Sequence, residues 1–220
     1  MADLPTLSGP VLPPADGGAP KRLAILLHGV GADGNDLIGL APFFQQALPD
    51  ALFVSPNAPF RYDMAPMGHQ WFSIRDFSPE ARLAGAGETA PILDAFIDAR
   101  LAEYGLTDDR LVLIGFSQGT MMALYVGLRR AQSPAGIIGY SGVLVGAESM
   151  AGEIRSRPPV LLVHGDADPV VPVQALPLAV ESLEALGVGV QAHTRPGLGH
   201  GIDEEGIRLG QEFLSEVFGE

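Results

Sequence analysis

The sequence predicts an α/β fold in which a mostly parallel central sheet is flanked by helices. Short apolar runs alternate with helical patterns from Arg22 to the carboxyl end, and such alternation favours a parallel sheet with right-handed crossovers. Most of these runs are continuously apolar, which is typical of strands covered on both faces. Hydrophobic residues make up 47% of the 220 residues, which is enough to bury such a sheet.

The elements follow in a regular order after an irregular start. Residues 1–20 are rich in Pro, Gly and Ala, and we expect an irregular arm there, with or without one short edge strand. Residues 21–220 are expected to form a single domain. The predicted strands are Leu23–Leu27, Leu52–Ser55, Leu111–Ile114, Gly136–Tyr140, Val160–Val163 and Val188–Thr194. Helices are predicted near residues 35–48, 88–104, 117–131, 172–186 and 203–218.

Residues 59–87 break this rhythm. The segment is long, and we expect it to be irregular; loops of this length in compact domains are usually functional or mobile. It contains the only tryptophan, Trp71, within a group of apolar side chains that could line an acyl pocket or simply pack the loop onto the body. The group consists of Met64, Met67, Trp71, Phe72, Ile74 and Phe77.

Charge and composition argue against some binding partners and exclude chemistry that needs cysteine. The formal net charge is −13, from 13 basic and 26 acidic residues, which argues against nucleic acid and anionic lipid surfaces. The absence of cysteine excludes disulfides and thiolate chemistry. Met1–Pro5 have neither a basic nor an apolar signal region, and no apolar run is long enough to span a bilayer. We therefore expect a cytoplasmic protein that does not insert stably into membranes.

The pentapeptide Gly115-Phe116-Ser117-Gln118-Gly119 directly follows an apolar strand and precedes an apolar helical stretch. A strand that turns into a helix through Gly-x-Ser-x-Gly holds the serine in a strained, exposed elbow. The two glycines are expected because a Cβ there would collide with the neighbouring strand or helix. Ser117 is thus the predicted nucleophile.

An activated serine needs a base and an acid, which follow it in the order acid, then histidine, when the serine sits on such an elbow. Of the downstream histidines, His164 closes a strand and is expected to structure the next turn, and His193 lies within a strand. His200 lies in a glycine-rich loop between the last strand and the last helix. We predict His200 as the general base.

Two carboxylates compete for the role of the acid in the turn Gly165–Pro172. Aspartates in such turns usually bond the local backbone, and we assign that role to Asp166. Asp168 lies further out, and Pro169 stiffens its backbone, so Asp168 is better placed to reach His200. We therefore favour Asp168 as the acid.

Acyl transfer also needs two N–H donors for the oxyanion of its tetrahedral intermediate. One is expected to be the amide of Gln118, at the start of the helix after the nucleophile. The second is expected from the glycine-rich turn after the first strand, with Val30 as the candidate. His28 is expected to pin that turn without transferring protons, and Asp33 and Asp36 are expected as turn and N-cap residues.

Together, the segments LLHGVGADG, GFSQG, HGDADPVVP and GLGH resemble the phospholipase/carboxylesterase family of small α/β-hydrolases, from about Leu23 to the last helix. The family includes acyl-protein thioesterases and lysophospholipases. The resemblance implies an α/β-hydrolase fold without a large cap domain and a homodimer near the active site. It also implies Ser117, Asp168 and His200 as a triad, with the amides of Val30 and Gln118 as oxyanion hole. Thr120 departs from the family, which commonly has a second glycine there.

The sequence thus predicts a serine carboxylesterase that hydrolyses small-molecule esters of short to medium chain length through an acyl-serine intermediate, with Trp71 in the substrate site. No metal or organic cofactor is expected. The alternatives are an acyl-protein thioesterase or lysophospholipase and, more remotely, a non-catalytic binding protein on a hydrolase scaffold. Dienelactone-type hydrolysis normally uses a cysteine, which this chain lacks.

Overall fold

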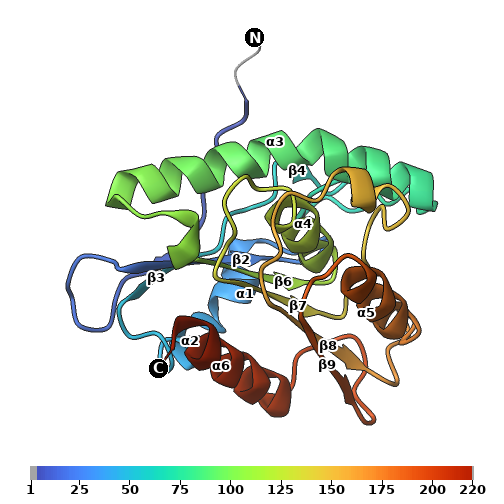
Figure 1. The fold of residues 1–220 in the computed structure, drawn as a ribbon. Helices are drawn as coiled ribbons and strands as arrows, with labels where there is room; N and C mark the ends of the chain where they lie inside the picture. The colour runs from blue at the N-terminus through green and yellow to red at the C-terminus, as the bar shows by residue number, and fades with distance from the viewer. Residues whose placement is uncertain (1–3, 220) are drawn as a thin grey trace.

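A computed structural model describes residues 4–219 and contains a seven-stranded sheet (Figure 1). The strands lie in the order β1-β3-β2-β6-β7-β8-β9. Neighbouring strands are parallel except at the β1–β3 edge, where Val11 pairs antiparallel with Val54. The mostly parallel sheet is confirmed. Its strands are β1 (Val11–Leu12), β2 (Arg22–Leu27), β3 (Ala51–Val54), β6 (Leu111–Phe116), β7 (Gly136–Tyr140), β8 (Val160–Gly165) and β9 (Val190–Arg195).

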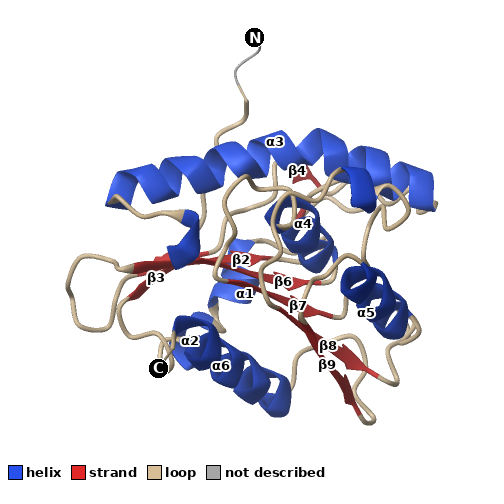
Figure 2. Cartoon of the chain, in the orientation of Figure 1, coloured by secondary structure: helices blue, strands red, loops and turns tan. Residues whose placement is uncertain are grey.

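Helices cover both faces of the sheet (Figure 2). Helices α3 (Pro79–Tyr104), α4 (Gln118–Gly127) and α5 (Ala175–Ala185) pack on one face. Helices α1 (Gly34–Ile38), α2 (Ala41–Phe44) and α6 (Glu204–Phe218) pack on the other. Two 3₁₀ turns, η1 (Asp108–Arg110) and η2 (Met150–Gly152), complete the helical elements of the described residues.

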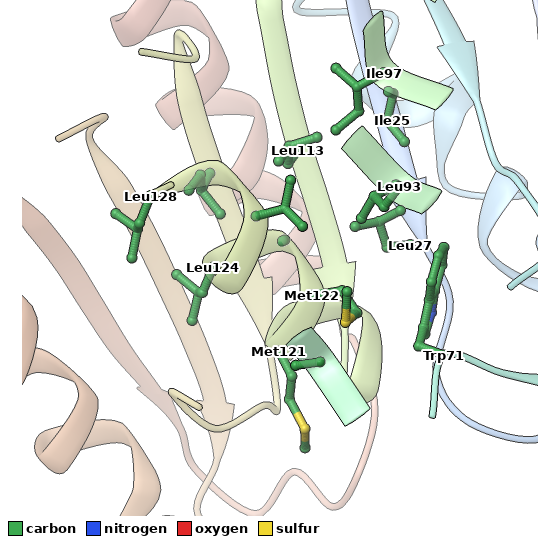
Figure 3. Close-up of a cluster of buried hydrophobic side chains, with 14 of the residues drawn as sticks. Ile25, Leu27, Trp71, Leu93, Ile97, Leu113, Met121, Met122, Leu124 and Leu128 are labelled. Carbon is green, nitrogen blue, oxygen red and sulfur yellow. The ribbon is translucent and has the colours of Figure 1, made fainter. Parts of the chain in front are cut away.

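The apolar run of β2 explains this three-layer arrangement. Successive side chains of a strand point to opposite faces. Accordingly, Leu23, Ile25 and Leu27 enter the hydrophobic cluster beneath α3, α4 and α5, whereas Ala24 and Leu26 enter the cluster on the opposite face. All five are fully buried. Figure 3 shows the first cluster, in which side chains of β2, α3 and α4 meet.

The predicted helix near residues 35–48 is wrong as a single element. The structure has α1 and α2 instead, separated at Gly39 and Leu40. Pro42 explains the break, because it has no N–H to donate to the carbonyl of Ile38 and its ring disfavours a continuous helix. Proline fits the first turn of α2, where the amides need no partner from within the helix.

The expected irregular segment at residues 59–87 is also partly wrong. It contains the hairpin β4 (Phe60–Arg61) and β5 (His69–Gln70), and its last residues belong to α3, which begins at Pro79. Ser78 caps this helix, since its hydroxyl accepts a hydrogen bond from the Ala81 amide at 3.2 Å. Proline at the first helical position is favourable as well.

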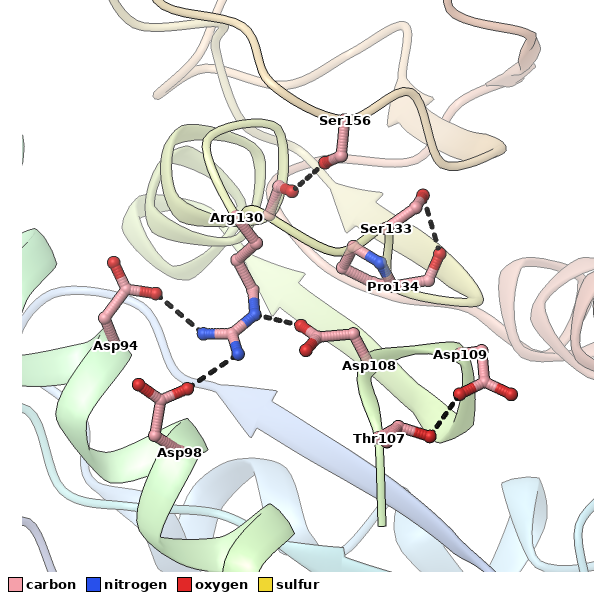
Figure 4. Close-up of polar contacts among 10 residues, drawn as sticks. Asp94, Asp98, Thr107, Asp108, Asp109, Arg130, Ser133, Pro134 and Ser156 are labelled. Atoms are coloured by element: carbon pink, nitrogen blue, oxygen red, sulfur yellow. Dashed lines mark hydrogen bonds and ion pairs between the residues drawn. The ribbon is translucent and has the colours of Figure 1, made fainter.

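Helix α4 ends at Gly127, earlier than the expected helix near residues 117–131. The carbonyl of Leu128 accepts hydrogen bonds from the amides of Arg155 at 2.9 Å and Ser156 at 3.2 Å, so it is not used to extend the helix. Beyond this point Arg130 turns toward three carboxylates, from two turns of α3 and from η1 (Figure 4). The three are Asp94, Asp98 and Asp108.

Candidate active site

Ser117 lies at the sharp turn between β6 and α4. Its backbone has φ 54° and ψ −114°, and Ser141 is the one other non-glycine residue of the described chain with positive φ. Such a conformation is strained for a side chain with a Cβ and persists only where its surroundings enforce it. Here the Ser117 amide donates to the Tyr140 carbonyl at 2.9 Å on the adjacent strand. The strained turn is the one expected from the pentapeptide, but the expected exposure is wrong, because Ser117 is only 7% exposed.

The flanking glycine at position 119 is required by close packing. A Cβ on Gly119 would lie 1.8 Å from the carbonyl oxygen of Leu27 in β2, and one on Gly115 would lie 2.4 Å from the amide of Thr120. Any side chain would push the helix away from the sheet. This agrees with the steric reason expected from the sequence. Thr120 itself is accommodated, because its hydroxyl lies 2.8 Å from the carbonyls of Gly115 and Tyr140.

The structure brings His200 and Asp168 together. His200 Nδ1 lies 2.7 Å from Asp168 Oδ2, and the carboxylate side chain is fully buried. The other oxygen, Oδ1, accepts hydrogen bonds from the amides of Val170 at 2.8 Å and Val171 at 2.9 Å. Because an ionised carboxylate only accepts, Nδ1 carries the proton and Nε2 is left as the basic nitrogen.

The surroundings of Asp168 favour its ionised form. Burial alone would raise the pKa of this carboxyl, but the hydrogen bonds from His200 and from the amides of Val170 and Val171 outweigh burial and lower the pKa. The ring of His200 packs against that of Phe116, with centroids 4.8 Å apart. Phe116 directly precedes Ser117, so the imidazole lies beside the elbow.

The competing candidates have other contacts. Asp166 accepts a hydrogen bond from the Gly197 amide at 2.6 Å and so ties its turn to the loop that carries His200. The buried ring of His164 lies with Nε2 2.9 Å from the Val171 carbonyl and 3.5 Å from Asp168 Oδ2. His164 thus holds the turn around Asp168, as expected. His193 lies in β9, at the edge of the sheet.

The turn after β2 lies next to the nucleophile. A Cβ on Gly29 would lie 3.4 Å from the Ser117 Cβ. His28 is fully buried, its Nε2 accepts from the Ala58 amide at 2.9 Å, and its Nδ1 lies 2.7 Å from the Gly29 carbonyl. Burial lowers the pKa of His28, which suits a neutral ring that pins the turn. Asp33 caps α1 by accepting from the Asn35 amide at 2.8 Å, whereas Asp36 lies within the first turn of that helix.

The two predicted oxyanion donors are backbone amides beside the elbow. Within residues 4–219, neither the Val30 amide nor the Gln118 amide donates to a protein acceptor. Gln118 is the first residue of α4, where the helix dipole also favours negative charge. Free N–H groups in these positions can stabilise a developing negative charge on a carbonyl oxygen.

The apolar group around Trp71 separates into two sets. Trp71 and Phe72 are buried at 0% and 3% exposure, and the indole Nε1 donates to the His28 carbonyl at 2.9 Å. This favours the packing alternative for Trp71, because its ring is not at the surface. In contrast, Ile74 is half-buried, and Met64, Met67 and Phe77 are exposed at 59%, 77% and 46%.

Sequence reasoning missed the side chain of Gln118, which is buried and bonded at both ends of its amide to the segment containing Trp71. The sequence holds no local signal for this contact, since the partners are more than forty positions away.

None of the helices within residues 4–219 has the length and apolar character needed to cross a membrane. The same residues include no group of three or more His, Asp or Glu side chains arranged so that it could hold a metal ion.

Comparisons with known proteins identify the family of this chain. Residues 15–218 match the Phospholipase/Carboxylesterase family. The chain is 31% identical over 208 residues to Acyl-protein thioesterase 1 of Neurospora crassa, covering 87% of this chain and 85% of that protein. It is 27% identical over 194 residues to Esterase YpfH of Escherichia coli, covering 88% and 82%.

Among solved structures, that of esterase PE8 has a TM-score of 0.92 at 45% identity and covers 96% of this chain and 99% of its own. The structure of SOBER1 from Arabidopsis thaliana has a TM-score of 0.81 at 24% identity, covers 90% of this chain and 99% of its own, and supports the fold. The predicted α/β-hydrolase fold and the predicted family are confirmed. The chain belongs to the phospholipase/carboxylesterase family.

Proposed function

We propose that this protein is a serine carboxylesterase that hydrolyses carboxylic esters of short to medium chain length through an acyl-serine intermediate. Ser117 is the proposed nucleophile, His200 the base and Asp168 the acid. The observation that carries the proposal is the strained Ser117 elbow beside an imidazole whose Nδ1 is held by a buried carboxylate. An oriented imidazole is what turns a weak serine hydroxyl into a nucleophile.

The reaction is two successive acyl transfers. Ser117 Oγ attacks the ester carbonyl carbon while His200 Nε2 accepts the hydroxyl proton, and Asp168 stabilises the resulting imidazolium. The carbonyl oxygen becomes an oxyanion and accepts hydrogen bonds from the amides of Val30 and Gln118. The carbon–oxygen bond to the alcohol then breaks, and the alcohol leaves with the proton from His200. Water attacks the acyl-serine by the same steps and releases the carboxylic acid.

The nucleophile is tested by the Ser117→Ala variant. We expect turnover of a p-nitrophenyl ester to fall by on the order of 10⁴-fold or more, because the covalent route is lost. The variant must be purified and shown by circular dichroism and thermal melting to be folded. A folded Ser117→Ala protein with near-normal turnover would reject the assignment of Ser117.

A second candidate is an acyl-protein thioesterase or lysophospholipase. It is favoured by relatives that carry the name Acyl-protein thioesterase 1 and by the exposed apolar side chains of Met64, Met67 and Phe77. Rates on acetyl, butyryl, octanoyl and palmitoyl esters, measured beside a palmitoyl thioester, separate the two. Highest kcat/KM at butyryl to octanoyl supports the carboxylesterase, and highest kcat/KM on palmitoyl substrates supports the alternative. The homodimer and the cytoplasmic location stay predictions.

A further inference from the structure

We propose that the side chain of Gln118 is a positioning residue for the oxyanion hole, and that it acts by fastening the elbow to residues 68–72. We call residues 68–72 the brace. The inference rests on the proposed function, because it concerns how the two N–H donors of that site are held. The backbone amide of Gln118 is the proposed donor to the substrate. The inference gives a separate, positioning role to the side-chain carboxamide of the same residue.

Both ends of the Gln118 carboxamide are bonded to the brace. Its Oε1 accepts from the Trp71 amide at 2.8 Å, and its Nε2 donates to the Phe72 carbonyl at 2.8 Å. The residue is 1% exposed, so these bonds are shielded from water. Two bonds from one planar group fix both the position and the rotation of the first residue of α4. They therefore fix the direction of its backbone N–H.

The other end of the brace holds the turn that carries Val30. The amide of Gly31 donates to the His69 carbonyl at 2.8 Å, and the amide of His69 donates to the Ala32 carbonyl at 2.8 Å. On the other side of Val30, the His28 carbonyl accepts from Trp71 Nε1 at 2.9 Å. Val30 is thus held between residues that are bonded to the brace, while its own amide has no acceptor in the described part of the chain.

Two further features keep the brace in place. A Cβ on Gly68, which has φ +88°, would lie 2.1 Å from the Gly31 carbonyl oxygen, so the two backbones are in direct contact. The hydroxyl of Thr89, on α3, donates to the Trp71 carbonyl at 2.6 Å. The brace is therefore one rigid part that sets the separation of the Val30 and Gln118 amides. Preorganised donors stabilise an oxyanion only when they are held at that separation before the reaction.

The test uses the full chain and three variants that weaken the brace at different bonds. Gln118→Met removes both carboxamide bonds at similar volume. Gln118→Glu keeps an acceptor for the Trp71 amide and loses the donor to Phe72. Trp71→Phe retains an aromatic ring and removes the bond to His28. The matched control is Gln211→Met on α6, where the glutamine Nε2 likewise donates to a backbone carbonyl, that of Phe43, at 2.8 Å.

We expect kcat on a p-nitrophenyl ester to fall about 10- to 100-fold in each brace variant, with KM within about threefold of the wild-type value, because the donors serve the transition state. An alkyl boronic acid adds to the serine to give a tetrahedral anion that mimics this state. Its inhibition constant should rise by the same factor as kcat/KM falls. Gln211→Met should change neither value, although its melting temperature can drop.

The outcomes separate this inference from the proposed function. Folded brace variants with wild-type kcat and wild-type boronic acid affinity would overturn the role of Gln118 and leave the esterase proposal intact. The role of Gln118 would also be overturned if kcat/KM fell because KM rose, while the affinity for the boronic acid stayed at the wild-type value. A wild-type protein without esterase activity would overturn both. Should Gln118→Met not fold, Gln118→Glu and Trp71→Phe decide the question.

Discussion

The carboxylate of Asp168 is fully buried and accepts hydrogen bonds from His200 and from two backbone amides. Asp168→Asn keeps the shape of the side chain but can present a donor to His200 Nδ1, which favours the wrong tautomer. We expect kcat to fall by about 10⁴-fold at neutral pH, the loss that this change causes in serine hydrolases with such a triad. A fall of less than about tenfold in a folded variant, measured by steady-state kinetics, would contradict the role of Asp168.

The lowered pKa of Asp168 also predicts how its contribution to the free energy of unfolding depends on pH. The pKa of Asp168 is lower in the folded protein than in an unfolded chain, where it is about 3.9. A lowered carboxyl pKa stabilises the fold above the unfolded value, and this contribution is lost as pH falls through the folded value. The difference in free energy of unfolding between wild type and Asp168→Asn should therefore shrink from pH 6 toward pH 3. Urea titrations that show a constant or growing difference would contradict the ionised state of Asp168.

Individual residues also show which contacts of the site could be predicted from the sequence and which could not. The order of motifs along the chain selected His200, and turn chemistry selected Asp168 over Asp166; the structure places these two side chains 2.7 Å apart. The partners of Gln118 could not be predicted. They depend on where a hairpin far away in the sequence folds back, and no periodicity or turn residue encodes that position.

At the scale of elements, α3 shows why boundaries are harder to predict than strands. Gly85 and Gly87 lower the helix propensity of its first turns, which hid the true start at Pro79. The cap at Ser78 and the packing of the helix on α4 outweigh that propensity. The five central strands β2, β3, β6, β7 and β8, in contrast, are mostly apolar runs that are buried along nearly their whole length, which made them easier to predict.

The cluster around Arg130 ties α3, η1 and the end of α4 together (Figure 4). The side chain of Arg130 is 8% exposed and contacts three carboxylates. Burial alone would lower its pKa, but its hydrogen bonds to Asp108 and Asp98 raise the pKa, so it stays charged. Arg130→Ala leaves the buried Asp108 without this partner, and we expect the free energy of unfolding to fall by about 3–5 kcal/mol.

The control for this prediction is Asp98→Asn. Asp98 is 67% exposed, so its ion pair with Arg130 is screened by water and should contribute within about 1 kcal/mol. Urea unfolding measures both variants, and neither should alter kcat, because the cluster lies away from the proposed site residues. An equal fall in the free energy of unfolding in the two variants would show that burial does not determine how much each ion pair of this cluster contributes to stability.

At the scale of the whole molecule, the two hydrophobic clusters share the strands of one sheet, and we propose that residues 21–220 unfold as one domain. Trp71 is the only tryptophan and is fully buried in one cluster, so its fluorescence reports on that face. Far-ultraviolet circular dichroism reports on all elements. The two signals should change together in a urea titration. Separate transitions would show that the faces unfold independently.

The central claim is that Ser117 is an activated nucleophile, and the most direct measurement is its reaction with a fluorophosphonate probe. Only a serine that is deprotonated on attack and supported by an oxyanion hole reacts rapidly. We predict one adduct per chain by intact mass, located on Ser117 by peptide mapping, and absent from the Ser117→Ala variant and from heat-denatured protein. A folded wild-type protein that takes up no probe, or takes it up on another residue, would contradict the account.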